Sequence, residues 1–430
     1  MGTVINVTLL FLAVFLSPAL WIRYRTLPVF EQTEPWFHLS NVWTESELDS
    51  LQDLVRSQKV LKTAAEDFTN AVVLIDQPLT PEGLCPHRFL VERNGRCVFP
   101  SRVDMASHYM FTGGRYGAKE KFTQMVNNIQ TFQNHIFGDD LKRPELKSLF
   151  ESKDYLHAAK TVCGPNYPVI DRVQVNVVMM LPGQDLPMHY DLPWFKNGAN
   201  RFNLPQWLLL AMAGSGLWAD QAMPQVQGVA YLHLNETING GSFFLYPDGP
   251  GGPVTSFPSN ANTGSVLDGI KVIHGVNRFM PGRVAPNIGK RVAKLVLDEG
   301  SQDTWTLVNE DQEVLGKYNM NELRITLVWR SLCFESEEQR SQWNPKSSTF
   351  AAEDALQALE KDLRKRNVLA QDQARPEMLD FALMLIKEYI KYPIDNFENA
   401  WFPLNYCVLP NATTNKFLKN IFEMFVQAFC

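Results

Sequence analysis

The tripeptide His189-Tyr190-Asp191 is the motif in this sequence with the clearest capacity for chemistry. It is the only His-x-Asp tripeptide among the eight histidines, and it follows a run of alternating residues typical of a strand. The spacing sets an imidazole and a carboxylate beside each other where the chain leaves a strand. His274 lies far enough along the chain to approach from another strand. Two histidines and one carboxylate on one face of an octahedral metal leave the opposite positions open, so we predict a non-haem iron site.

The third ligand has a rival, and the metal has an alternative. His233 also lies in a predicted strand, but His274 is favoured because Gly275 follows it, as expected where backbone crowds a ligand site. Two histidines and a carboxylate also suit Zn²⁺. The chain has no His-Glu-x-x-His motif, which argues against a helix-borne zinc site. A zinc hydrolase, a non-catalytic metal-binding barrel and a membrane-tethered recognition scaffold remain as alternative functions.

The elements that must position these residues are short strands within 165–335. Runs with strand character occupy 171–178, 228–236, 240–247, 264–276 and 323–332, and they are separated by Gly, Pro and Asn. The runs 228–236 and 240–247 are predicted to form a hairpin across 236–240. A second hairpin is predicted at 304–318, inside an insertion spanning 284–320. Regular short strands with turn signals favour a barrel or sandwich.

Both flanks of this region have helical character. Residues 26–164 are predicted to be mostly helical, with one helix over 45–58 capped by Thr44 or Ser46 and another over 118–137. Residues 336–430 return to helical periodicity. The apolar run 205–220 predicts a helix packed beside the barrel, near its mouth. We therefore expect an α+β fold with helical N- and C-terminal extensions around a β core.

Within 165–335 the chain resembles the Fe(II)/2-oxoglutarate-dependent dioxygenases, whose core is a double-stranded β-helix, or jelly roll. The elements that carry the resemblance are, in chain order, His189 with Asp191, Gly240-Gly241-Ser242-Phe243, His274-Gly275-Val276 and Arg324-Ile325-Thr326. The resemblance implies that His189, Asp191 and His274 bind Fe(II). It also implies 2-oxoglutarate and O₂ as co-substrates, succinate and CO₂ as co-products, and ascorbate as an optional reductant.

Arg324 is the residue predicted to bind 2-oxoglutarate. A guanidinium group is a planar fork that matches the far carboxylate of that molecule. Thr326 lies two residues on, so it projects from the same face of a strand and can add a hydrogen bond. Arg324 lies farther from the distal histidine than the basic residue of the family usually does. The rival arginines are Arg283, Arg291 and Arg330.

The resemblance also limits the reaction and leaves two substrate classes. Asp191 occupies the place that halogenating relatives leave open for halide, so hydroxylation, desaturation or oxidative ring closure of an aliphatic C–H bond is expected. A small-molecule substrate is favoured because the long segment between Asp191 and His274 contains the apolar run 205–220, which would cover a pocket. The alternative is prolyl- or lysyl-type hydroxylation of a protein. The predicted aromatic pocket walls are Trp194, Phe195, Trp207 and Trp218.

The N-terminus and the cysteines favour the secretory pathway or a membrane-anchored protein. Residues 3–22 carry no charge, so 1–25 is predicted to be a signal sequence or an anchor that attaches the protein to a membrane. Cys85 and Cys97 flank the turn signal Asn94-Gly95, and a disulfide is predicted across that hairpin. Glycosylation sequons occur at Asn235 and Asn411.

The size and charge of the chain exclude other classes. Its 430 residues are 45% hydrophobic and 11% aromatic, which is ample for a folded core. The formal net charge of −6 argues against nucleic acid as a partner, since phosphate binding needs a basic surface. The expected partner is a small-molecule or peptide substrate.

Overall fold

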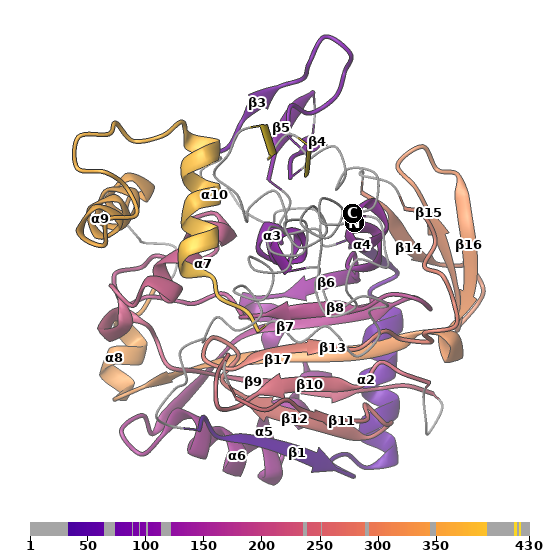
Figure 1. The fold of residues 1–430 in the computed structure, drawn as a ribbon. Helices are drawn as coiled ribbons and strands as arrows, with labels where there is room; N and C mark the ends of the chain where they lie inside the picture. Colours follow the sequence, from indigo (N-terminus) through magenta and orange to yellow (C-terminus); the bar gives the residue numbers. More distant parts are fainter. Residues whose placement is uncertain are drawn as a thin grey trace, which may run out of the picture.

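The computed structural model describes residues 33–63, 74–87, 89–93, 95–99, 102–112, 122–234, 239–250, 252–288, 292–344, 350–393, 417–418 and 421–422. Within them, helices and antiparallel sheets combine in one mixed fold (Figure 1). The order of the larger sheet is β1-β12-β9-β17-β7-β6-β2-β14-β15-β16. Its strands are β1 (Trp36–Ser40), β2 (Val60–Thr63), β6 (Phe132–Ile136), β7 (Val169–Met180), β9 (Gln225–Tyr231), β12 (Thr263–Leu267), β14 (Lys294–Leu297), β15 (Thr304–Val308), β16 (Val314–Asn319) and β17 (Arg324–Phe334).

A four-stranded sheet of order β11-β10-β13-β8 packs against the inner face of the larger one. Its strands are β8 (Leu186–His189), β10 (Phe243–Tyr246), β11 (Thr255–Phe257) and β13 (Ile273–Val276). The buried side chains of Met180 and Val229 from the larger sheet form one cluster with Phe243 and Val276 from the smaller. Alternation along each strand thus turns one set of side chains into the space between the sheets.

The predicted hairpin between 228–236 and 240–247 is wrong. β9 pairs with β12 and β17 in the larger sheet, whereas β10 pairs with β11 and β13 in the smaller. Both edges of β9 are therefore occupied, and the chain crosses from one sheet to the other between these strands. Local turn signals do not distinguish a hairpin from such a crossing. The hairpin predicted at 304–318 is confirmed by the pairing of β15 with β16.

The helix predicted over 118–137 ends earlier than expected. α4 covers Phe122–Asn128, and the chain then enters β6, which pairs with β7 and β2. The alternating run at 132–136 fills a free edge of β7, so sheet pairing overrides the local helical signal. The larger sheet therefore includes β1, β2 and β6, which come from the N-terminal region predicted to be mostly helical. It also includes β14, β15 and β16, which come from the predicted insertion at 284–320.

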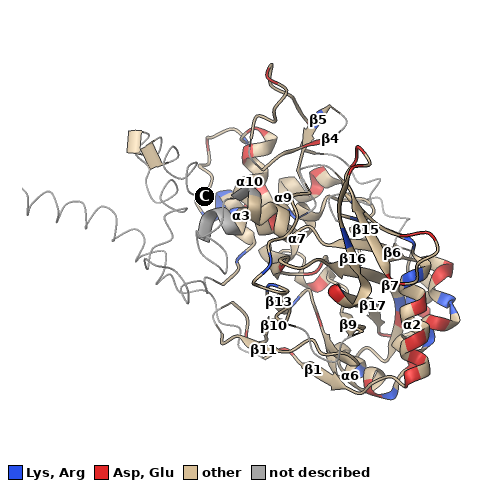
Figure 2. Ribbon diagram, turned by 90° about the vertical axis from the view of Figure 1, so that its right-hand side faces the viewer, with Lys and Arg blue, Asp and Glu red and all other residues tan. Residues whose placement is uncertain are grey.

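Helices cover the outer face of the larger sheet. α2 (Glu45–Ser57), α5 (Lys147–Glu151) and α6 (Lys153–Cys163) pack against the odd-numbered residues of β7 and β17. The predicted helix at 45–58 is confirmed, and Thr44 is its N-cap in a complete capping box with Glu47. Lys and Arg residues are scattered among Asp and Glu over this side of the molecule (Figure 2).

A second group of helices forms a buried cluster separate from the one that covers the larger sheet. α7 (Gln206–Ser215) packs against α9 (Ala352–Lys365) and α10 (Met378–Tyr389) in one buried cluster. The helix predicted from 205–220 is therefore present, but its apolar side chains meet other helices rather than the mouth of the barrel. The remaining helices are α3 (Val103–Thr112) and α8 (Glu337–Gln342).

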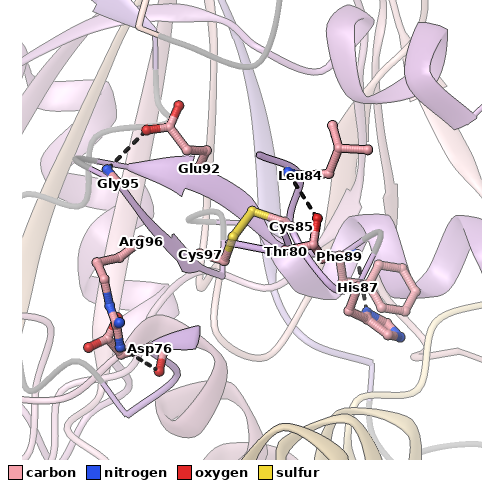
Figure 3. Close-up of a disulfide and its surroundings, with 10 residues drawn as sticks. All are labelled: Asp76, Thr80, Leu84, Cys85, His87, Phe89, Glu92, Gly95, Arg96 and Cys97. Carbon is pink, nitrogen blue, oxygen red and sulfur yellow. Dashed lines mark hydrogen bonds and ion pairs between the residues drawn. A yellow bond between two sulfur atoms is a disulfide. The ribbon is translucent and has the colours of Figure 1, made fainter. Parts of the chain in front are cut away.

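Two disulfides join parts of the described chain. Cys85 and Cys97 are linked beside the hairpin of β4 (Val91–Arg93) and β5 (Arg96–Val98), which also pairs with β3 (Gln77–Pro78) (Figure 3). This disulfide agrees with the prediction, and Gly95 in the turn has a φ of 76°, which glycine adopts without strain. The second disulfide, between Cys163 and Cys333, was not predicted and ties the end of α6 to β17.

Several sequence predictions lie outside the described residues. These are the signal or anchor at 1–25, both sequons and most of the last predicted helix. Among the helices that the structure describes, none is both long and apolar enough to span a bilayer.

Candidate metal centre and its cavity

His189, Asp191 and His274 meet between the two sheets. His189 ends β8 and stands directly opposite His274 in the neighbouring strand β13, while Asp191 follows β8 by two residues. One potential ligand atom from each side chain lies within 4.8 Å of the others, and all three residues are buried. The structure therefore brings together the three side chains that the sequence pattern singled out.

Both imidazole rings are held in one tautomer. Nδ1 of His189 lies 2.8 Å from the Pro187 carbonyl oxygen, and Nδ1 of His274 lies 2.9 Å from that of Val272. A carbonyl oxygen only accepts, so each Nδ1 carries the proton and each Nε2 keeps its lone pair. Burial lowers the pKa of His189 well below its ordinary value and also lowers the pKa of His274. Both rings are thus neutral at physiological pH, which is the form that binds a metal.

Asp191 presents one oxygen that fits a metal ion. Its Oδ1 accepts a hydrogen bond from Nη2 of Arg330, whereas its buried Oδ2 has no hydrogen-bond partner and lies 3.8 Å from Nε2 of His274. A buried oxygen without a partner is costly unless another group satisfies it. The donor set of two imidazole nitrogens and one carboxylate oxygen fits Fe(II), and the open side of the set faces a cavity.

Glycines make room for these ligands. A Cβ atom at Gly269 would lie 2.0 Å from Oδ2 of Asp191, and one at Gly275 would lie 2.7 Å from the Leu186 carbonyl oxygen. The Gly269 carbonyl also accepts a hydrogen bond of 2.8 Å from the Asp191 N–H. Only glycine at 269 leaves the carboxylate where it meets the histidines.

We expect Gly269→Ala to weaken iron binding at least about tenfold while the protein stays folded, because the methyl group displaces the Asp191 carboxylate. Equilibrium dialysis with Fe(II) under argon would measure the loss. Gly282→Ala is the matched control, since a Cβ there meets no atom within 4 Å. Equal affinity in the two variants would separate Gly269 from the metal site.

His233, the rival third ligand, has another role. Its Nδ1 accepts a hydrogen bond of 3.1 Å from the Ile325 N–H, and burial lowers its pKa to about 3. The ring stacks on Tyr231 and is absent from the cluster of three potential ligands. His233 thus supports the strand that carries Arg324.

Arg324 is a buried guanidinium group at one end of the same cavity. Its Nε donates to the Gly241 carbonyl oxygen at 3.0 Å, Nη1 to the Thr326 hydroxyl at 2.9 Å and Nη2 to Ser259 Oγ at 3.1 Å. These acceptors are all neutral, and no carboxylate pairs with Arg324 among the described residues. Burial lowers its pKa to about 10. A buried charge without a counter-ion calls for an anion.

The rival arginines differ from Arg324 in position. Arg330 donates to Asp191 and, through Nε at 2.8 Å, to Oε1 of Gln227, so it supports the metal site. Arg283 is exposed, and Arg291 lies outside the described residues.

One cavity of about 150 Å³ connects the metal ligands with Arg324. Its wall includes Arg102, Met105, Ile129, Thr131, Gln133, Asn176, Val178, Met180, Gln227, Phe243, Thr326, Val328 and Arg330. The predicted aromatic walls are wrong: Trp194, Phe195, Trp207 and Trp218 pack in two clusters away from the cavity. The number of aromatic residues in a segment does not indicate which face of a strand or helix lines a cavity.

The cavity also contains polar residues that the sequence interpretation missed. Arg102, Asn176 and Gln227 come from three separate segments of the chain. For Arg330 the sequence does offer a signal. It is an even number of residues from Arg324 and Thr326 along β17, so the three side chains project from the same face of the strand.

Comparisons with known proteins yield structural likenesses alone. No protein-family model and no curated protein matches the chain. The solved structures that resemble it include a prolyl hydroxylase with a hypoxia inducible factor peptide from Trichoplax adhaerens, at 12% identity and a TM-score of 0.33, covering 73% of this chain and 89% of that one. A prolyl-4-hydroxylase from Pseudomonas putida follows at 10% identity and 0.30, covering 70% and 94%.

A third similar structure is HygX from Streptomyces hygroscopicus, with nickel, 2-oxoglutarate and hygromycin B bound. It has 11% identity and a TM-score of 0.29, covering 70% of this chain and 83% of that one. The three likenesses are thus to a peptide-bound prolyl hydroxylase, a second prolyl hydroxylase and a protein with hygromycin B bound. The functional assignment below rests on the side chains of the site.

Proposed function

We propose that this protein is an Fe(II)- and 2-oxoglutarate-dependent dioxygenase. The observation that carries the proposal is that one cavity contains both an open His₂-carboxylate set and a buried guanidinium group whose partners are all neutral. The first group suits Fe(II), and the second suits the far carboxylate of a chelating dicarboxylate.

The proposed roles follow from the contacts. His189, Asp191 and His274 would hold Fe(II), which, with 2-oxoglutarate and O₂, supplies the oxidation of an aliphatic C–H bond, releasing succinate and CO₂. Arg324 would bind the far carboxylate of 2-oxoglutarate, assisted by the Thr326 hydroxyl. Tyr231, whose ring lies 5.2 Å below the Arg324 guanidinium, supports its position.

Other residues hold these groups in place and keep water out. Arg330 fixes one oxygen of Asp191 and leaves the other directed at the metal position. Val178, Val229 and Val328 line the stretch between the metal ligands and Arg324. Such an apolar wall strengthens the electrostatic contacts at both ends.

The size of the cavity supports a compact substrate. The cavity of about 150 Å³ must hold both 2-oxoglutarate and the reacting part of the substrate. We favour a small molecule, undergoing hydroxylation, desaturation or ring closure, and a prolyl or lysyl side chain of a protein is the second candidate.

Arg324 weighs against the alternatives of another class. A zinc hydrolase or a non-catalytic barrel needs no anion at the far end of the cavity, whereas the proposed enzyme does. Succinate release from 2-oxoglutarate tests this directly: we expect it with Fe(II) and not with Zn²⁺. Hydrolytic activity with Zn²⁺ and no succinate with Fe(II) would contradict the proposal.

The fold proposed for the core is the double-stranded β-helix. The crossing of the chain between β9 and β10, and the packing of the two sheets around the site, support it.

We also propose that the body of the protein lies in an oxidising compartment, because two disulfides join the described cysteines. The expected result is that Cys85, Cys97, Cys163 and Cys333 in freshly extracted protein resist alkylation until a reductant is added. Mass spectrometry of the peptides would measure this. Alkylation of Cys85 and Cys97 without reductant would favour a cytosolic body instead.

A further inference from the structure

Arg102 is another guanidinium group on the cavity wall, and neither the metal site nor the Arg324 site uses it. Its Nε and Nη2 donate to the two carboxylate oxygens of Asp104 at 2.9 and 2.6 Å. Nη2 also lies 3.4 Å from the carbonyl oxygen of Tyr190, between two of the proposed metal ligands in sequence. Nη1 makes no hydrogen bond with the described residues, and the side chain lines the cavity.

The position of Arg102 is fixed by Asp104 and the residues that contact it. Asp104 is buried and also accepts a hydrogen bond of 2.6 Å from the hydroxyl of Tyr392. The ring of Tyr392 lies 5.8 Å from that of Tyr190 and 5.3 Å from that of His108. Tyr392, three residues after the end of α10, therefore holds the Asp104 carboxylate that orients Arg102. The guanidinium group is planar, so hydrogen bonds at Nε and Nη2 also fix the direction of the N–H groups on Nη1.

Asn176 supplies a second donor in the same cavity. Arg201 Nη1 donates to Gln174 Oε1 at 3.0 Å, and Gln174 Nε2 donates to Asn176 Oδ1 at 2.6 Å. This series of hydrogen bonds uses the side-chain oxygen of Asn176, so the Nδ2 amide group is left for a ligand in the cavity. Arg102 and Asn176 thus both present N–H groups.

The charges on the wall favour an anion. The wall carries the guanidinium groups of Arg102, Arg324 and Arg330 and the carboxylate of Asp191, while Asp104 pairs with Arg102 outside the lining. Fe(II) and the 2-oxoglutarate dianion would add no net charge. One positive charge therefore remains after both are bound. Arg102 and Arg330 each have an Nη1 without a hydrogen bond among the described residues. Arg330 already holds the proposed iron ligand Asp191, which leaves Arg102 as the guanidinium available to a further anion.

We propose that the substrate carries a carboxylate, which binds to Arg102 Nη1 with Asn176 Nδ2 as a second donor. This inference rests on the proposed function and narrows the substrate to a compact carboxylic acid. It also separates the two substrate candidates, because an internal side chain of a protein has only neutral backbone carbonyl groups beside it.

Anaerobic calorimetry on the full chain tests the inference. The protein with Fe(II) is titrated first with 2-oxoglutarate and then with matched pairs: propionate and propionamide, benzoate and benzamide, N-acetylglycine and its amide. We expect the acid of at least one pair to bind about tenfold or more tightly than its amide. No preference for the acid in any pair would overturn the inference.

The variant that tests the residue is Arg102→Gln combined with Asp104→Asn. Arg102→Gln alone would leave the buried Asp104 carboxylate without its partner, which is strongly destabilising. The double variant keeps the net charge and should lose the preference for acids while it still binds 2-oxoglutarate. Arg102→Lys, which keeps the charge without the fork, should reduce the preference and serves if the double variant does not fold.

The exposed Arg283→Gln is the control and should keep the preference for acids. A preference retained in the Arg102 variants would overturn the assignment. Failure of the proposed function has a different signature, since it removes the heat of 2-oxoglutarate binding in the first titration.

Discussion

Replacing Asp191 with alanine is expected to abolish iron-dependent release of succinate and to lower the affinity for Fe(II) by more than about 100-fold. Loss of a residue that merely orients a metal ligand costs about 10- to 100-fold, and Asp191 is proposed to be a ligand itself. The change also removes the partner of Arg330, whose side chain is 9% exposed. A buried charge left alone in this way destabilises a protein by about 3–5 kcal/mol.

This loss of stability must be separated from the loss of metal. Asp191→Ala combined with Arg330→Gln removes both charges, so its thermal unfolding should be closer to that of the wild type while iron binding stays lost. His233→Asn is the matched control, because His233 lies outside the ligand cluster and asparagine keeps an acceptor for the Ile325 N–H. Full turnover in the Asp191 variants, or its loss in His233→Asn alone, would remove Asp191 from the metal site.

Replacing Arg324 with glutamine is expected to weaken 2-oxoglutarate binding by at least about 100-fold, or about 2.8 kcal/mol, with Fe(II) still bound. The guanidinium is 2% exposed and its contacts are all neutral, so nothing else on the wall near it offsets a carboxylate. Titration of the anaerobic iron protein with 2-oxoglutarate measures the change. Unchanged affinity would transfer the role to another arginine.

The stability of the Arg324 variant gives a second signature. Burial lowers the pKa of Arg324 to about 10, below its value in the unfolded chain. The unfolded state therefore holds this proton more tightly, which destabilises the ligand-free fold at neutral pH and ceases to do so as the pH rises past the unfolded value. Arg324→Gln should thus melt near the wild type without ligand. Addition of 2-oxoglutarate to the Fe(II)-loaded proteins should raise the melting temperature of the wild type much more than that of the variant.

The pair His189 and Asp191 could be predicted from sequence because the required geometry is local, whereas His274 was indicated by the His-Gly-Val motif of the resemblance. Asp191 follows His189 by two residues, which sets both side chains at the end of one strand, and β13 brings His274 opposite. Arg324 and Thr326 share a strand face by parity, and their hydrogen bond agrees with that prediction. The pairing of His189 with Asp191 and that of Arg324 with Thr326 each need only the period of a strand.

Other features depend on which strands become neighbours. Arg330 lies on the same face as Arg324, yet its partner, Asp191, is far away in sequence and could be assigned only from the register of the sheets. The crossing between β9 and β10 was read as a hairpin for the same reason. Arg102 and Asn176 carry no motif, so their place on the wall follows from the folded arrangement alone.

The measurement that tests the central proposal most directly is an anaerobic titration of protein lacking residues 1–25 with Fe(II) and then 2-oxoglutarate. Chelation of iron by the keto acid produces a visible charge-transfer band, and His189→Ala serves as the control. We predict a band in the wild type and none in His189→Ala. A folded wild-type protein that binds no 2-oxoglutarate and shows no band would contradict the dioxygenase assignment and favour a hydrolase or a non-catalytic barrel.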